Sequence, residues 1–182
     1  MKTLLIAIIL LAGSLSAAAQ TKTSVIGEID IYTNGINSFI KTKPKSRIFG
    51  DPSATEKSSW REVKAKQAED LYKKAEVWSR EGKVVAVNFA LSSPSGDWAH
   101  LITYYFRADG TLAKIEAQLN TFYGNISIIR QRYYDTNRKQ LKATERYHDL
   151  ETQKPVKRPK DYFDNPVPVY SRVSSLPFGR LL

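Results

Sequence analysis

Residues Lys83–Leu150 carry the feature that most constrains the fold, an alternation of apolar and polar side chains. Apolar residues recur at nearly every second position over residues 85–91, 113–119 and 141–147. A period of two places one set of side chains in a core and the other in water, which is typical of β-strands. Polar turn sequences separate the runs at residues 92–97, 109–110, 124–125 and 135–137. Because such short links join antiparallel neighbours, the stretch predicts a meander of about five strands.

The segment Ser59–Glu81, just before the meander, has the spacing of an amphipathic helix. Ser59 and Glu62 match a capping box, and Gly82 would end the helix. The apolar residues at helical spacing are Trp60, Val63, Ala68, Leu71, Ala75 and Trp78. We therefore predict an α+β fold in which one long N-terminal helix packs on the antiparallel meander. This outline resembles the cystatin-like and NTF2-like folds in layout alone.

The first 19 residues have the three parts of a secretory signal. Lys2 supplies the positive start, residues 4–12 supply a short apolar region, and Ala17–Ala19 supply the small residues before a cleavage site at Gln20. The apolar run is short for a bilayer span, and an uncleaved anchor is the alternative interpretation. Cleavage predicts a mature protein that is soluble outside the cytoplasm, either secreted or periplasmic.

Two further segments flank the predicted core, which covers residues 59–150. Within residues 20–58, Asn34–Gly35 is the preferred pair for a two-residue turn, so we expect a hairpin over Glu28–Ile40 and a loop over Lys41–Ser58. Residues 151–182 form a basic, proline-rich tail. Its many apolar side chains predict that it lies against the core, with a short strand added at the edge of the sheet.

The composition limits the chemistry and the partners. The chain of 182 residues has a net charge of +10 and no cysteine, which excludes disulfides and thiolate metal sites. The charge favours an anionic polymer or a lipid headgroup as partner, although solubility alone would also explain it. Nucleic acid ranks lower, since an exported protein rarely meets it. No sequence motif indicates a cofactor, a metal site or a catalytic centre.

A basic face is the first candidate binding site. Lys114, Arg130, Arg132, Lys142 and Arg146 fall on consecutive strands of the predicted meander. If these strands pair in order, several of the cations lie on one face of the sheet, within a Debye length of one another. Such a face predicts binding of anionic ligands.

Two titratable residues are the other candidates. Glu145 shares the parity of the apolar residues in its strand, which predicts a carboxylate with a raised pKa or a basic partner, Arg130 or Arg132. The alternative is a strand-end residue turned to water or a purely structural ion pair. His100 follows Asp97, and the two could orient one another as a dyad. The alternative is that Asp97, as a turn residue, bonds nearby backbone.

These observations support three hypotheses about function. The first is a non-catalytic exported binding module for an acidic or polymeric envelope ligand. The second is a small hydrolase or isomerase that uses Glu145 or His100 in a pocket between helix and sheet. The third is a structural protein that docks a partner through its tail. A pocket lined by convergent polar groups would favour the enzyme, and a flat patch would favour the other two.

Overall fold

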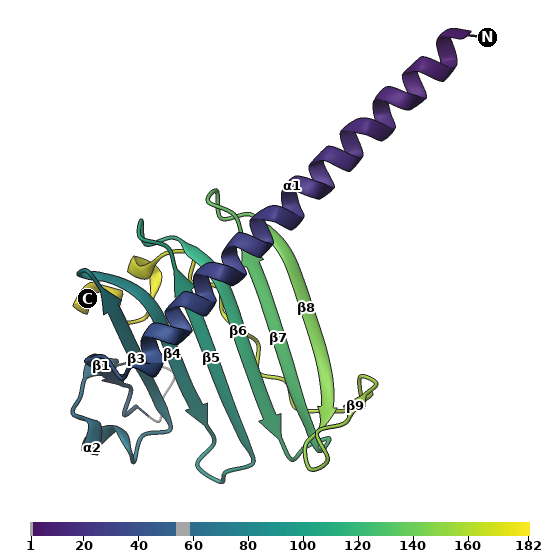
Figure 1. Ribbon diagram of the computed structural model, residues 1–182. Coiled ribbons are helices and arrows are strands. Elements are labelled where there is room, and N and C mark those ends of the chain that lie inside the picture. Colours follow the sequence, from purple (N-terminus) through teal and green to yellow (C-terminus); the bar gives the residue numbers. More distant parts are fainter. Residues whose placement is uncertain (1, 54–58) are drawn as a thin grey trace.

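The computed structural model describes residues 2–53 and 59–182, with side chains described from Lys22 onward. It is an α+β fold with one long helix, α1 (Lys2–Lys41), and a nine-stranded antiparallel sheet (Figure 1). The strands are β1 (Ser46–Gly50), β2 (Arg61–Glu62), β3 (Lys73–Arg80), β4 (Lys83–Ser92), β5 (Trp98–Phe106), β6 (Leu112–Thr121), β7 (Ile126–Tyr134), β8 (Gln140–Asp149) and β9 (Pro155–Val156). Their order in the sheet is β2-β1-β3-β4-β5-β6-β7-β8-β9.

The five strands predicted from the alternation are confirmed as β4 to β8, which pair in sequence order. The polar turns predicted between them also form. The glycine of the turn at residues 109–110 has a φ of +77°, a conformation that side chains with a Cβ rarely adopt. The predicted count of about five is too low for the whole sheet, because β1, β2 and β3 extend it on one side and β9 on the other.

The predicted helix over Ser59–Glu81 is wrong. This segment contains β2, a short helix α2 (Ala65–Ala68) and β3. Ala75 and Val77 are both buried, which follows the period of a strand, and β3 pairs along its length with β4. Trp60 and Trp78 do not share a face, since they contact different clusters of buried residues. Pairing with β4 therefore outweighs the helical spacing of the segment.

The predicted hairpin around Asn34–Gly35 is also wrong, because α1 runs through it. Ile29, Thr33 and Ile36 are buried at helical spacing, whereas Asn34 and Gly35 are exposed on the opposite side of the helix. The loop predicted over Lys41–Ser58 contains β1, and its residues 54–58 lie outside the described part of the chain. A turn sequence that is common in hairpins is thus tolerated on the solvent side of a helix that is held by its apolar face.

α1 crosses one face of the sheet diagonally, from β3 towards β8, and we call this the helix face (Figure 1). The contact follows a row of three β-bulges. Val85 in β4, Ala113 in β6 and Leu141 in β8 are the residues left without a partner where the register shifts. Each of the three belongs to a cluster that includes α1 side chains, such as Ile36 beside Val85 and Ile29 beside Ala113. The bulges turn these side chains towards the helix.

The C-terminal tail, residues 151–182, lies across the opposite face, which we call the tail face (Figure 1). β9 pairs with the end of β8, and Tyr104 on β5 donates a hydrogen bond to the carbonyl of Pro168. The tail also contains two short 3₁₀ turns, η1 (Val173–Ser175) and η2 (Gly179–Leu181). Phe178 is 2% exposed and stacks on Phe49 of β1 with ring centroids 4.4 Å apart. The largest core cluster therefore lies between the tail and the sheet.

The predicted signal peptide at residues 1–19 falls on residues whose side chains lie outside the described part of the chain. The backbone of residues 2–19 belongs to α1, whose first turns extend past the sheet (Figure 1). Among the described residues, no helix combines the length and the apolar character that a bilayer crossing requires. Cleavage after Ala19 remains a prediction.

Candidate functional site

The predicted basic face does not form as one surface. Arg130 and Arg132 lie on the tail face. Lys142 and Arg146 lie on the helix face, because they pair with Tyr133 and Ile129, which alternate with the two arginines along β7. Two of the cations are buried. Lys114 is 5% exposed and Arg130 is 6% exposed, and each is ion-paired with two carboxylates. These two cations are therefore not available to an external anion.

On the tail face, Arg130 is the centre of a cluster that joins two strands to the tail. Its Nε lies 2.6 Å from Oε2 of Glu145, directly across from it on β8. Its Nη2 lies 2.8 Å from Oδ1 of Asp164 in the tail. Arg132, two residues along β7, donates a hydrogen bond of 3.2 Å to the carbonyl of Val167. Both arginines thus bind the tail to the sheet.

Glu145 lies on the tail face with Arg130 as its basic partner, one of the two alternatives that its parity predicted. Burial alone would raise the pKa of Glu145, but hydrogen bonds from Tyr147 and Arg130 outweigh it and lower the pKa. A carboxylate that is held ionised in this way is a weak general base at neutral pH. The geometry gives Glu145 a positioning role towards Arg130.

His100 is fully buried on β5, with an exposed fraction of 0%. Neither ring nitrogen has a hydrogen-bond partner in the described part of the chain. Desolvation, assisted by the positive charge of Arg130 and opposed by Asp164, lowers its pKa to about 4. The predicted dyad with Asp97 does not form, since the Asp97 carboxylate instead accepts a hydrogen bond from the hydroxyl of Ser95. This contact joins two side chains of the turn, so it differs from the bond to nearby backbone that was the alternative.

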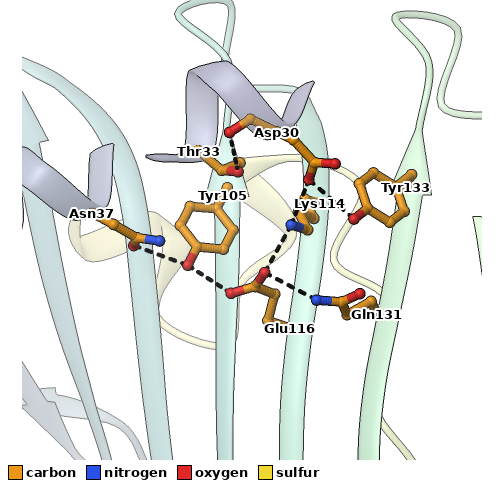
Figure 2. Close-up of polar contacts among 8 residues, drawn as sticks. All are labelled: Asp30, Thr33, Asn37, Tyr105, Lys114, Glu116, Gln131 and Tyr133. Carbon is orange, nitrogen blue, oxygen red and sulfur yellow. Dashed lines mark hydrogen bonds and ion pairs between the residues drawn. The ribbon is translucent and has the colours of Figure 1, made fainter. Parts of the chain in front are cut away.

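The helix face has a second buried polar cluster (Figure 2). Lys114 on β6 lies 2.7 Å from Asp30 of α1 and 2.7 Å from Glu116 of its own strand. Tyr133 donates to Asp30, and Tyr105 donates to Glu116 (Figure 2). Burial would lower the pKa of Lys114, but the two carboxylates outweigh it and raise the pKa.

Sequence reasoning missed this helix-face cluster because it placed Asp30 and Asn37 in a hairpin. The side-chain amide of Asn37 lies 3.0 Å from the hydroxyl of Tyr105 (Figure 2). The signal that could have found the cluster is the spacing of seven residues between Asp30 and Asn37. On a helix, this spacing puts both residues beside the stripe of Ile29, Thr33 and Ile36.

The exposed cations gather at a different place, along β8, in the turn before it and in the segment that follows it. They are Arg138, Lys139, Lys142, Arg146, Lys154, Lys157, Arg158 and Lys160. None of the eight is within ion-pair distance of a carboxylate in the described part of the chain. We call this set the basic edge. Among the described residues, no group of three acidic or histidine side chains could hold a metal ion.

Trp98 lines two separate hollows. One, of about 740 Å³, is lined by aromatic residues of the β6–β7 turn and of the tail. The other, of about 730 Å³, lies between the start of β3 and the end of β4. Neither is lined by Glu145 or His100, so the residues predicted for an enzyme site do not converge on either hollow.

Comparisons of the chain with protein-family models, with curated proteins and with solved structures found no match. The function has to be inferred from the geometry of the chain itself.

The buried His100 predicts a pH-dependent stability. Its folded pKa of about 4 lies below the ordinary value of 6.5, so the unfolded chain binds the proton more tightly. Stability from a neutral His100 is fully present above pH 6.5 and is lost as the pH falls towards the folded pKa. Between pH 7 and pH 4.5, where most carboxylates stay ionised, we expect a loss of about 2–3 kcal/mol in the free energy of unfolding.

Urea unfolding at a series of pH values measures this loss. The variant His100→Phe should have a flat profile between pH 6.5 and 4.5, because it has no proton to bind there. His148→Gln is the matched control, since His148 is the other histidine of the chain and is partly exposed. A His100→Phe profile that keeps the parent's slope would show that another group causes the pH dependence.

Proposed function

We propose that this protein is a non-catalytic binding module for an anionic polymer, which it contacts through the basic edge. The observation that carries the proposal is the concentration of charge there. Residues 138–160 contain eight Lys and Arg and three acidic residues, so this short segment accounts for half of the net charge of +10. Unpaired, exposed cations in one region raise the local concentration of polyanions.

The geometry of the basic edge supports a polymeric ligand. Lys142 and Arg146 are exposed on the helix face of β8, and four residues of strand separate them by about 13 Å. β9 pairs with Tyr147 and His148, which brings Lys157 and Arg158 beside the end of the same strand. Cations from two chain segments thus line one margin of the sheet.

The neighbouring acid does not cancel this charge. Glu145 lies between Lys142 and Arg146 in sequence, but its carboxylate is on the tail face and is bound by Arg130. Because strand residues alternate between faces, Glu145 is separated from Lys142 and Arg146, the two exposed cations of β8. Among the hypotheses drawn from the sequence, a binding surface for anions fits this arrangement better than an acid–base site.

We further propose that the protein is exported after cleavage at Gln20, which the N-terminal pattern of charge, apolar run and small residues supports. N-terminal sequencing of the protein from its native host should begin at Gln20. Met1 at the N-terminus of a soluble cytoplasmic protein would contradict the proposal.

Charge reversal on the basic edge tests the binding proposal. The chain from Gln20 should be retained on immobilised dextran sulfate at about 50 mM salt and should elute by about 200 mM, since counterion-linked binding falls steeply over this range. Lys142→Glu with Arg146→Glu should reduce retention strongly. Both side chains are exposed, so the fold should be kept.

The matched control is Arg61→Glu with Lys66→Glu, which changes the net charge equally. These exposed cations lie in β2 and α2, and β2 is the strand at the opposite end of the sheet. Equal loss in the two double variants would show that net charge alone governs retention, and unchanged retention of Lys142→Glu with Arg146→Glu would exclude the basic edge. Vesicles with and without phosphatidylglycerol distinguish a lipid surface from a polysaccharide.

A further inference from the structure

The hollow of about 740 Å³ beside Trp98 has a wall made largely of aromatic rings. Trp98 comes from β5, Phe122 and Tyr123 from the β6–β7 turn, and Tyr162 and Phe163 from the tail. Trp98 and Phe163 stack with ring centroids 5.5 Å apart, which fixes one side of the hollow. Volume and lining both fall in the range of small-molecule sites.

Two of these rings are largely exposed to solvent. Phe122 is 69% exposed and Tyr123 is 63% exposed, so both give up the burial that usually stabilises an aromatic side chain. The turn that carries them is well defined. Gly124, with a φ of +93°, allows the tail to approach, since a Cβ there would lie 3.0 Å from that of Tyr162.

The charged groups of the hollow are both acidic, although the chain as a whole is strongly basic. Asp97 and Asp164 line it together with the aromatic rings and Thr121. Asp164 is held in place by the buried guanidinium of Arg130. Asp97 forms no ion pair with a described residue, and its carboxylate accepts a hydrogen bond from the hydroxyl of Ser95.

One ring of this wall already has a cation over it. The guanidinium carbon of Arg158 lies 5.6 Å from the centroid of the Tyr162 ring, within the range of a cation–π contact. Aromatic rings with an adjacent carboxylate are the arrangement that recognises alkylated ammonium groups, because the ring faces and the acid both attract positive charge while the rings also bury the alkyl carbons.

We propose that this hollow binds an organic cation with an alkylated ammonium group. The site differs from the basic edge in the charge that it attracts. Arg158 of the basic edge lies over the Tyr162 ring, but neither Lys142 nor Arg146, the residues reversed in the test above, lines the hollow. The two proposals can therefore fail separately.

A titration with choline tests the proposal, followed by the indole N–H of Trp98 in ¹H–¹⁵N spectra of the full chain from Gln20. Choline should shift this signal and the amides of Phe122 and Tyr123 to saturation. Its uncharged isostere, 3,3-dimethylbutan-1-ol, should bind at least several-fold more weakly, since a cation–π contact contributes a factor of about 2 to 30.

Variants on the exposed wall locate the effect. Phe122→Ala with Tyr123→Ala, and separately Asp97→Asn, should each weaken choline binding. Tyr72→Ala and Asp70→Asn are the matched controls, because both residues are exposed and lie outside the hollow. Equal binding of choline and its isostere, unchanged binding in the wall variants, or binding of maltose in place of choline would overturn the proposal.

Discussion

A buried cation shared between two carboxylates holds each covering segment on the sheet. Lys114 joins Glu116 of the sheet to Asp30 of α1, and Arg130 joins Glu145 of the sheet to Asp164 of the tail. In both cases one acid comes from the sheet and the other from the cover. The cations are 6% and 7% exposed in their side chains, whereas their acids are exposed by about a third or more.

Such triads specify position more than they add net stability. The cost of desolvating a buried charge offsets much of its attraction to the partners, so apolar replacement of a whole triad can leave stability nearly unchanged. Removal of the cation alone leaves two carboxylates without their partner and is destabilising. Apolar contacts of Ile29 and Ile36 under α1, and of Val167 and Phe178 under the tail, contribute the burial energy. We infer that the triads decide where on the sheet each cover lies.

The sequence predicts the part of the fold in which apolar and polar residues alternate with a period of two. The strands β4 to β8 follow from alternation, and the parity of Glu145 predicted its basic partner Arg130, although the carboxylate itself is exposed. The bulges at Val85, Ala113 and Leu141 break that parity, and they direct towards α1 three side chains that alternation assigns to the other face. Local sequence signals also gave wrong predictions where tertiary contacts determine the structure. Ser59–Glu81 forms strands in place of a long helix, and Asn34–Gly35 lies in a helix in place of a hairpin turn. The partners Asp30 and Asp164 are 84 and 34 residues from their cations, a separation that no local pattern encodes.

The same triads determine which cations are available to bind a ligand. They remove Lys114 and Arg130 from the set of available cations, and Arg132 is likewise bound to the tail. The exposed charge that is left lies along the basic edge. Arg130 also fixes Asp164 at the wall of the aromatic hollow, so the interaction that positions the tail shapes this site as well.

The central claim is that each cover depends on its own buried cation, and native-state thiol labelling tests it directly. Because the chain has no cysteine, Ile36→Cys reports opening of α1 and Val167→Cys reports opening of the tail. Lys114→Met should speed labelling at position 36 by about tenfold, or ~1.4 kcal/mol of local opening, and leave position 167 unchanged. Arg130→Met should do the reverse. The claim would be contradicted if either variant sped labelling equally at positions 36 and 167, or if it sped labelling at neither position.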